Sequence, residues 1–170
     1  MLIVAIGLAN CTQPETTDTL GEQNKAVVDK FLQAQLKGDI HTLDQLLSDD
    51  FIDYSGVLAD SSRKEAYLEK VKQAWEETYT SGKYNRTARL AQTNKESKPH
   101  ETIAGDWVLE WGDITSNFKD GTASTIKFHA AFLVKEGKIK LITSFYNVAD
   151  AMSQRGYKFI PPGEQQPESK

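Results

Sequence analysis

The sequence is poor in the residues that build metal centres. Its 170 residues include one cysteine, Cys11, and three histidines, and none of these is clustered at the spacing of a metal-ligand set. A glycine-rich phosphate-binding motif is missing as well. The sequence therefore predicts no metal site and no cofactor.

Positive charge is also scarce, and it is scattered. The chain has 20 lysines and arginines against 24 aspartates and glutamates, which gives a formal net charge of -4. Proteins that bind nucleic acid usually carry a basic run or stripe, and this chain has neither. We therefore expect no nucleic-acid partner. The apolar share of 39% is enough for the core of one globular domain with short tails.

Long apolar runs are absent except at the N-terminus. The stretch "MLIVAIGLANC" is apolar over about ten residues, too few to span a bilayer but enough for the core of a secretory signal. Its end, Leu8, Ala9, Asn10 and Cys11, resembles the lipobox of bacterial lipoproteins. In that family the signal is cut before the cysteine, and the thiol carries lipid. A buried N-terminal strand with an ordinary free cysteine is the alternative.

The lipoprotein resemblance implies a location as well. It predicts a signal peptide over residues 1–10 and a lipidated tether over residues 11–21. The protein would be secreted across the inner membrane and held by lipid in the bacterial cell envelope. Its contact with the membrane would be through the lipid anchor only.

Three helices are predicted in the first half of the chain. Residues 19–22 and 62–65 have the spacing of capping boxes, and they predict helices over about residues 19–37 and 62–79. Asp39 is expected to cap a short helix between them.

The second half of the chain is strand-like. A turn is expected at "TSGKYN", residues 80–85, and short polar segments separate the later strands. The predicted strand segments are residues 86–93, 101–118, 123–134 and 138–148. Helices followed by antiparallel strands predict an α+β domain with the helices on one face of the sheet. Several strands are apolar on both faces, so we expect a homodimer through the open face.

The order of these elements resembles the nuclear transport factor 2 superfamily and, within it, the SnoaL-like polyketide cyclases. The resemblance rests on "FLQAQLKGDIHTLDQLLSDDFIDYSG", "DWVLEWG" and "FLVKEGKIKLITSFYNVADAM", and it covers about residues 22–155. It implies a cone-shaped curved antiparallel sheet wrapped around three N-terminal helices, with a pocket open at one end. Residues 156–170 are expected to form a disordered tail.

The stretch "DWVLEWGDI", residues 106–114, draws attention to one face of one strand. Alternation places Trp107, Trp111 and Asp113 together on that face. The face is expected to be either the pocket wall or the dimer face. Asp113 favours the pocket, because a carboxylate in a dry seam between protomers is costly.

The resemblance also implies where chemistry would take place. SnoaL-like cyclases place a histidine on a late strand, where this chain has His129, and Asp113 is the acid that could face it. The base of the ketosteroid isomerases falls near Ser55, which cannot act as that base, so Asp53 on the same strand face is the substitute. Asn147 stands where an acid is common in the family. The hypothetical catalytic pair is thus His129 and Asp113.

Five residues form the predicted ligand-binding set: Asp53, Tyr54, Trp107, Trp111 and Asn147. Each has a plainer interpretation. His129 and the tryptophans could be core residues, and Tyr54 could lie at a rim with its hydroxyl in water.

Three functions remain open at this stage. The first is an envelope-anchored domain that binds a small apolar or mixed ligand and has no catalytic activity or an unknown one. The second is an enzyme of the isomerase, cyclase or dehydratase kind that uses His129 and Asp113 as an acid–base pair. The third is a pure dimerisation module whose cone is filled by side chains.

Overall fold

The computed structural model describes residues 19–55, 61–95 and 104–160. The predicted signal peptide and the predicted lipidation site at Cys11 lie outside these residues, as does most of the predicted tail. None of the helices among the described residues is both long enough and apolar enough to cross a membrane.

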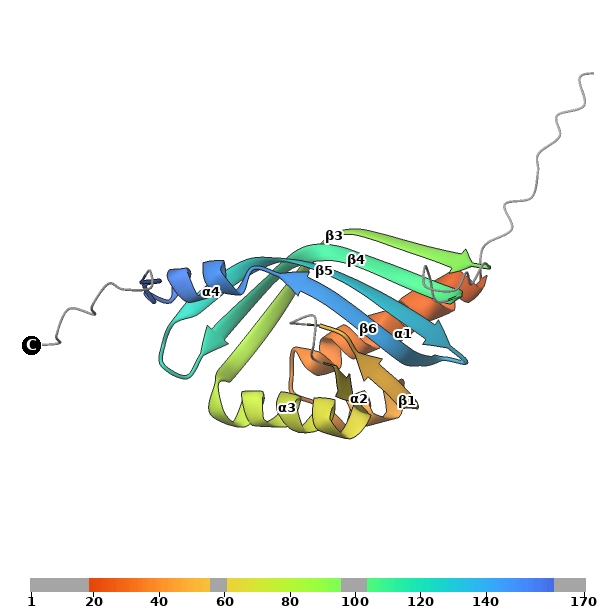
Figure 1. The fold of residues 1–170 in the computed structure, drawn as a ribbon, viewed down its shortest axis with the longest axis horizontal. Helices are drawn as coiled ribbons and strands as arrows, with labels where there is room; N and C mark the ends of the chain where they lie inside the picture. Colours follow the sequence, from red (N-terminus) through yellow and green to blue (C-terminus); the bar gives the residue numbers. More distant parts are fainter. Residues whose placement is uncertain (1–18, 56–60, 96–103, 161–170) are drawn as a thin grey trace, which may run out of the picture.

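The described residues form four helices and six strands (Figure 1). Their bounds are α1 Thr19–Gln35, α2 Ile40–Leu46, β1 Leu47–Asp53, β2 Ser62–Arg63, α3 Lys64–Glu77, β3 Tyr79–Asn94, β4 Gly105–Phe118, β5 Ala123–Lys135, β6 Lys138–Tyr146 and α4 Val148–Gln154. The strands form one sheet in the order β2-β1-β6-β5-β4-β3. This is the expected α+β class. The sheet is mixed rather than wholly antiparallel, because β1 runs parallel to β6.

The sheet curves over α1, and α2 and α3 lie on the same side (Figure 1). The helices are amphipathic at the predicted spacing, so that Val28, Phe31 and Leu32 of α1 all point into the core. From the sheet, alternate residues such as Val108 and Phe132 meet them. Burying each of these large side chains contributes about 1.5–3 kcal/mol. This core fixes the inner face of the sheet, which is the face toward α1.

Local signals explain the first helix boundaries. Gly38 has a φ of +64°, the left-handed conformation that ends a helix, and it follows the last turn of α1. Asp39 caps α2 as predicted, because its carboxylate accepts a hydrogen bond from the backbone N–H of Thr42 at 3.0 Å.

The predicted capping box at residues 62–65 is wrong. Arg63 is the residue before α3 and no side chain caps the helix there. Ser62 instead lies in β2, where it pairs with Asp53 of β1, and its hydroxyl accepts a hydrogen bond from Lys70 Nζ at 2.7 Å. Ser62 is therefore a strand residue that pairs with β1, and it does not cap α3.

The predicted turn at residues 80–85 is also wrong, because this segment belongs to β3 and pairs with β4 from Ser81 onward, after an irregularity at Thr80. Gly82 is a glycine for reasons of space. A Cβ atom there would lie 2.8 Å from the side chain of Leu36, just after α1. The sequence pattern also missed α4, which packs against β5 and whose N-cap is Asn147.

Candidate functional site

A cavity of about 270 Å³ lies inside the cone, between α1, α3 and the inner face of the sheet. Its wall is built from α1, α3, five strands of the sheet and the residues just after α1 and β1. The lining residues are Phe31, Leu32, Gln35, Leu36, Asp53, Ser55, Tyr67, Trp75, Tyr79, Tyr84, Ile114, Ile126, Phe128, Phe132, Ile142, Ser144 and Tyr146.

Aromatic rings dominate this wall, and they support one another. The Trp75 ring lies 5.8 Å from that of Tyr79, centroid to centroid, and the Tyr84 ring meets Phe128 edge-on at 5.9 Å. The Tyr67 ring stacks with Phe31 at 6.4 Å. Such contacts between rings stabilise by about 0.5–1.5 kcal/mol each and hold the ring positions.

Several polar groups of the wall are bonded to one another. Tyr67 donates its hydroxyl proton to Gln35 Oε1 at 2.9 Å, and the Trp75 indole N–H donates to the backbone oxygen of Gln35, also at 2.9 Å. Ser144 donates to the Ser55 hydroxyl at 2.7 Å. Gln35, at the end of α1, therefore fixes two aromatic side chains that come from α3.

Asp53 is the charged residue of the cavity. It ends β1, and its Oδ1 accepts a hydrogen bond from the backbone N–H of Ser55 at 2.9 Å. Burial, together with the negative charge of Asp53, raises the pKa values of Tyr67 and Tyr146. Both tyrosines therefore remain neutral hydrogen-bonding groups at ordinary pH.

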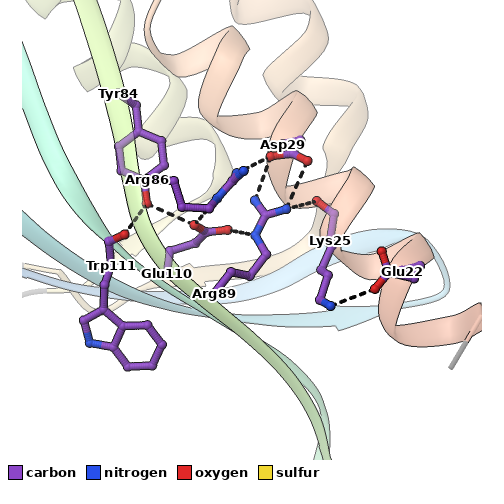
Figure 2. A network of polar contacts seen from close by, with 8 residues as sticks. All are labelled: Glu22, Lys25, Asp29, Tyr84, Arg86, Arg89, Glu110 and Trp111. Carbon is purple, nitrogen blue, oxygen red and sulfur yellow. Dashed lines mark hydrogen bonds and ion pairs between the residues drawn. The ribbon is translucent and has the colours of Figure 1, made fainter. Parts of the chain in front are cut away.

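A buried ion-pair network lies beside the cavity and joins α1 to the sheet (Figure 2). Its centre is Glu110 of β4, whose side chain is completely buried. Glu110 accepts hydrogen bonds from Arg86 Nε at 2.9 Å, from Arg89 Nε and from the Tyr84 hydroxyl at 3.0 Å. Both arginines also bond to Asp29 of α1. Two positive and two negative charges thus balance within the network.

This network holds a wall residue of the cavity in place. Tyr84 lines the cavity with its ring while its hydroxyl bonds to Glu110. Burial, the hydrogen bond to Glu110 and the charge of Glu110 together raise the pKa of Tyr84, so it stays a donor. At Asp29, burial opposes ionisation, but the hydrogen bonds from Arg89 and Arg86 outweigh it and hold the pKa of that carboxyl below its usual value.

Gly112 gives the Tyr84 ring its place. A Cβ atom on Gly112 would lie 2.4 Å from Tyr84 Cε2 and 2.5 Å from the backbone oxygen of Asn85. No larger residue fits there without moving the ring or the backbone of β3. Gly112, the glycine in "DWVLEWGDI", does not itself line the cavity. It shapes the wall indirectly, because it leaves the space that the Tyr84 ring occupies.

The predicted aromatic face lies on the other side of the sheet. Trp107, Trp111 and Asp113 alternate with the inward residues of β4 and so point away from α1. There Trp111 stacks on His129 with ring centroids 4.9 Å apart, and His129 in turn stacks on Phe145 at 6.4 Å. A shallow groove on this outer face is lined by residues that include Trp111, His129 and Asn147.

The structure does not bring the hypothetical catalytic pair together. Asp113 forms an ion pair with Lys127 at 2.7 Å, across from it on β5, while His129 lies between two rings. The Nε2 atom of His129 is buried and has no hydrogen-bond partner among the described residues. The pair therefore has no contact through which a proton could pass directly.

The predicted ligand-binding residues fall into two groups. Asp53 lines the inner cavity, whereas Trp111 and Asn147 line the outer groove and Trp107 lies on the same outer face. Tyr54 is half-exposed and lines neither hollow. Asn147 also accepts a hydrogen bond from the Asp150 backbone N–H at 3.0 Å as the cap of α4.

The sequence analysis assigned none of Tyr67, Trp75 and Tyr84 to a site. Tyr67 and Trp75 lie on α3, the helix predicted over about residues 62–79. Tyr84 lay in the segment taken for a turn. The one sequence feature that could have placed Tyr84 in a strand is that it lies two residues before Arg86, where the predicted strand of residues 86–93 begins.

No known family model matches this sequence, and no curated protein matches it in sequence. Solved structures do match. An LEH-like epoxide hydrolase from M. tuberculosis has a TM-score of 0.60 and 16% identity, over 79% of this chain and 90% of that one. IdmH from Streptomyces antibioticus, a proposed polyketide cyclase, has a TM-score of 0.62 and 14% identity over 79% and 99% of the two chains.

A third similar structure is a proposed SnoaL-like polyketide cyclase from Shewanella denitrificans. Its TM-score is 0.61 at 10% identity, over 78% of this chain and 96% of that one. At these identities the likeness shows the fold and not the activity. The resemblance inferred from the sequence is confirmed at that level: this chain has the nuclear transport factor 2-like fold that SnoaL-like proteins share.

Proposed function

We propose that this protein binds a small molecule in the inner cavity. The observation that supports this most directly is the cavity itself: about 270 Å³, walled by aromatic and aliphatic side chains, with a few polar groups at fixed positions. Small-molecule sites usually have this form, and the volume is just below their usual range of about 300–1,000 Å³, which suits a small ligand. A pure dimerisation module would have no need of such a space.

Tryptophan fluorescence tests this proposal selectively. The chain has three tryptophans, of which Trp75 lines the cavity while Trp107 and Trp111 lie on the outer face. A Trp107→Phe, Trp111→Phe double variant leaves Trp75 as the only reporter. We expect small apolar and mixed ligands to change its emission in a saturable way. If no compound in a broad panel does so while the protein stays folded, the cavity is not a binding site.

An enzyme of the isomerase, cyclase or dehydratase kind is the second candidate. It is favoured by Asp53, a carboxylate in the cavity whose charge acts on Tyr67 and Tyr146. A carboxylate base beside neutral tyrosine donors can move a proton on a bound carbonyl compound. Asp53 would replace the pair of His129 and Asp113 in this role. Asp53→Asn should then abolish turnover while ligand binding persists, and unchanged turnover would exclude the carboxylate as the base.

A homodimer through the outer face of the sheet is part of the same proposal. Leu90 and Phe145 expose 47% and 66% of their surfaces on this face, beside Trp107 and Trp111. Side chains of this kind usually mark an interface when they are contiguous. Light scattering at micromolar concentration should give twice the chain mass. A stable, soluble monomer would contradict the dimer and leave the apolar face without an explanation.

We also propose that the protein is anchored by lipid at Cys11 in the bacterial envelope. The support is the apolar run and the "LANC" junction in the sequence. Mass spectrometry of the mature protein from a bacterial host should find an acylated N-terminal Cys11, and Cys11→Ser should release the protein from membranes. A chain that keeps Met1 and carries no lipid would refute the anchor.

A further inference from the structure

The charge of the inner cavity is of one sign. Among the described residues that line it, Asp53 is the only one with a charged side chain, and no lysine, arginine or histidine is present. None of the four charged residues in the balanced ion pairs of Figure 2 lines the cavity. Tyr84 is the lining residue that contacts them, through its hydrogen bond to Glu110. An anionic ligand would therefore meet a negative charge and no compensating positive one.

The hydrogen-bond donors of the wall are largely engaged already. The hydroxyl protons of Tyr67, Tyr84 and Ser144 are donated to Gln35, Glu110 and Ser55 respectively. The indole N–H of Trp75 is donated to a backbone oxygen. Two further tyrosines of the wall, Tyr79 and Tyr146, keep their hydroxyl groups as neutral polar groups, and the Asp53 carboxylate supplies the negative charge. A ligand that brings positive charge can pair with that carboxylate while its apolar groups lie against the rings.

The aromatic rings of the wall would contribute to binding a positively charged ligand, in addition to the Asp53 carboxylate. Tyr67, Trp75, Tyr79 and Tyr146 all line the cavity that Asp53 lines. The negative face of an aromatic ring attracts an ammonium group, and the attraction grows when the site is shielded from water. Alkyl groups on the nitrogen fill apolar space at the same time. A divalent metal ion, by contrast, needs several oxygen ligands, and this cavity offers a single carboxylate.

From this arrangement we propose that the cavity takes a small organic ammonium ion, an alkylated amine whose positive charge faces Asp53 and whose alkyl groups lie against the aromatic rings. This inference rests on the proposed function, since it names the ligand class of the same cavity. It also explains how Asp53 can be kept in an aromatic wall, because a neutral apolar ligand would bury the carboxylate with no positive charge to pair with it.

Isosteric pairs of probes test the charge separately from the shape. Tetramethylammonium and tert-butanol are close in size, as are choline and 3,3-dimethylbutan-1-ol, and in each pair only the first carries a charge. Binding to the full chain is followed at the indole N–H signal of Trp75 in a nitrogen–proton correlation spectrum. We expect each cation to bind about tenfold or more tightly than its neutral counterpart.

Two pairs of variants locate the effect. Asp53→Asn should weaken the cations by about tenfold or more and leave the neutral probes unchanged, while Asp113→Asn on the outer face should change neither. Tyr146→Leu should weaken the cations, and Tyr146→Phe, which keeps the ring, should retain most of the affinity. Because Tyr146 is half-exposed, neither of its variants should prevent folding.

The outcomes separate this inference from the proposal on which it rests. Equal or tighter binding of the neutral probes would overturn the ammonium ligand and leave the small-molecule site intact. Equal effects of Asp53→Asn on charged and neutral probes would also overturn it. If none of the four probes disturbs the Trp75 signal at millimolar concentration, while other small molecules do, the ammonium class is wrong. If no molecule does, the binding site itself is refuted.

Discussion

Glu110 and Asp113 lie on the same strand but on opposite faces of the sheet, and their ion pairs are of different kinds. Glu110 is completely buried, and its carboxylate accepts hydrogen bonds from two arginines and a tyrosine, which stabilise its charge. Asp113 pairs with Lys127, whose side chain is 88% exposed. Removing a completely buried charge such as Glu110 is strongly destabilising because its partners are left unpaired, whereas an exposed pair contributes little.

The aromatic residues of the two faces differ in the same way. The rings around the cavity come from the inner face and from α3, and three of them donate hydrogen bonds to Gln35 of α1 or to Glu110. The outer rings, Trp111, His129 and Phe145, stack on one another along neighbouring strands and end at a phenylalanine that is 66% exposed. The rings around the cavity are therefore held by more polar contacts than the outer rings, which agrees with the proposed ligand site inside and the proposed dimer face outside.

The largest expected effect comes from breaking the inner network. Glu110→Ala removes the carboxylate and leaves Arg86 and Arg89 without the partner they share. We expect a loss of about 3–5 kcal/mol in the free energy of unfolding, measured from urea denaturation. A loss below about 1 kcal/mol, the range of exposed pairs, would show that the network is not the clamp between α1 and the sheet.

Gly112→Ala should come next. The added methyl group would collide with the Tyr84 ring and with the backbone of β3, and such overpacking costs about 1–3 kcal/mol. Ligand binding should weaken as well, because Tyr84 forms part of the cavity wall. The comparison variant is Tyr84→Phe, which keeps the ring and loses only its hydroxyl. Gly121→Ala would not serve as a control, because Gly121 has a φ of +83° and alanine would be strained there. Normal stability and binding in Gly112→Ala would contradict the close approach.

Trp111→Ala tests the outer stack. Trp111 is only partly buried, and its main ring contact is with His129. We expect a loss of about 1–2 kcal/mol in dilute protein, below the roughly 3–5 kcal/mol of a tryptophan in a packed core. Binding in the inner cavity should not change. A larger loss at high protein concentration than at low concentration would indicate that the ring lies in the proposed dimer interface.

The sequence predicted which residues of β4 share a face but not which face lies inside. Both faces of "DWVLEWGDI" carry large apolar side chains. Alternation alone therefore cannot tell which of the two faces packs against the helices and which points outward. The assignment depends on Glu110, the only acid of the stretch that is buried. Its partners Arg86 and Arg89 lie on the neighbouring strand, and Asp29 lies on a distant helix. Those contacts appear only when the chain is folded.

The elements themselves were easier to predict. Helical spacing located α1 and α3, and Asp39 located the start of α2, because these signals are local. Asp53 was placed in the cavity by the resemblance of the segment around it to known family members. The start of β3 was missed because Gly82 and its polar neighbours read as a turn, whereas the glycine is required by the side chain of Leu36. Tertiary contact thus overrode a local signal there.

A pH titration sharpens the comparison further. In the folded protein, the pKa of Asp29 lies below its usual value, so its ionised form stabilises the fold above the unfolded pKa of about 4, and the contribution is lost as the pH falls through the folded value. Asp29→Asn should cost on the order of 1 kcal/mol at neutral pH, since the side chain is 40% exposed and solvent screens it. Its unfolding free energy should also fall less steeply in acid than that of the wild type. Parallel acid profiles would contradict the role of Asp29.

The smallest expected effect is that of Asp113→Asn, and it completes the contrast with Glu110. The substitution keeps the shape of the side chain and removes the charge, so the only loss is the pair with Lys127 at the surface. We expect a change of about 0–1 kcal/mol in urea denaturation, and a change that shrinks further in high salt, because solvent and ions already screen such a pair. Lys127→Met should give a similarly small value, which makes it the matched control. If Asp113→Asn instead cost as much as Glu110→Ala, Asp113 would have to be buried in the protein in solution. A second copy of the chain covering the outer face would be the simplest cause, and the loss would then grow with protein concentration.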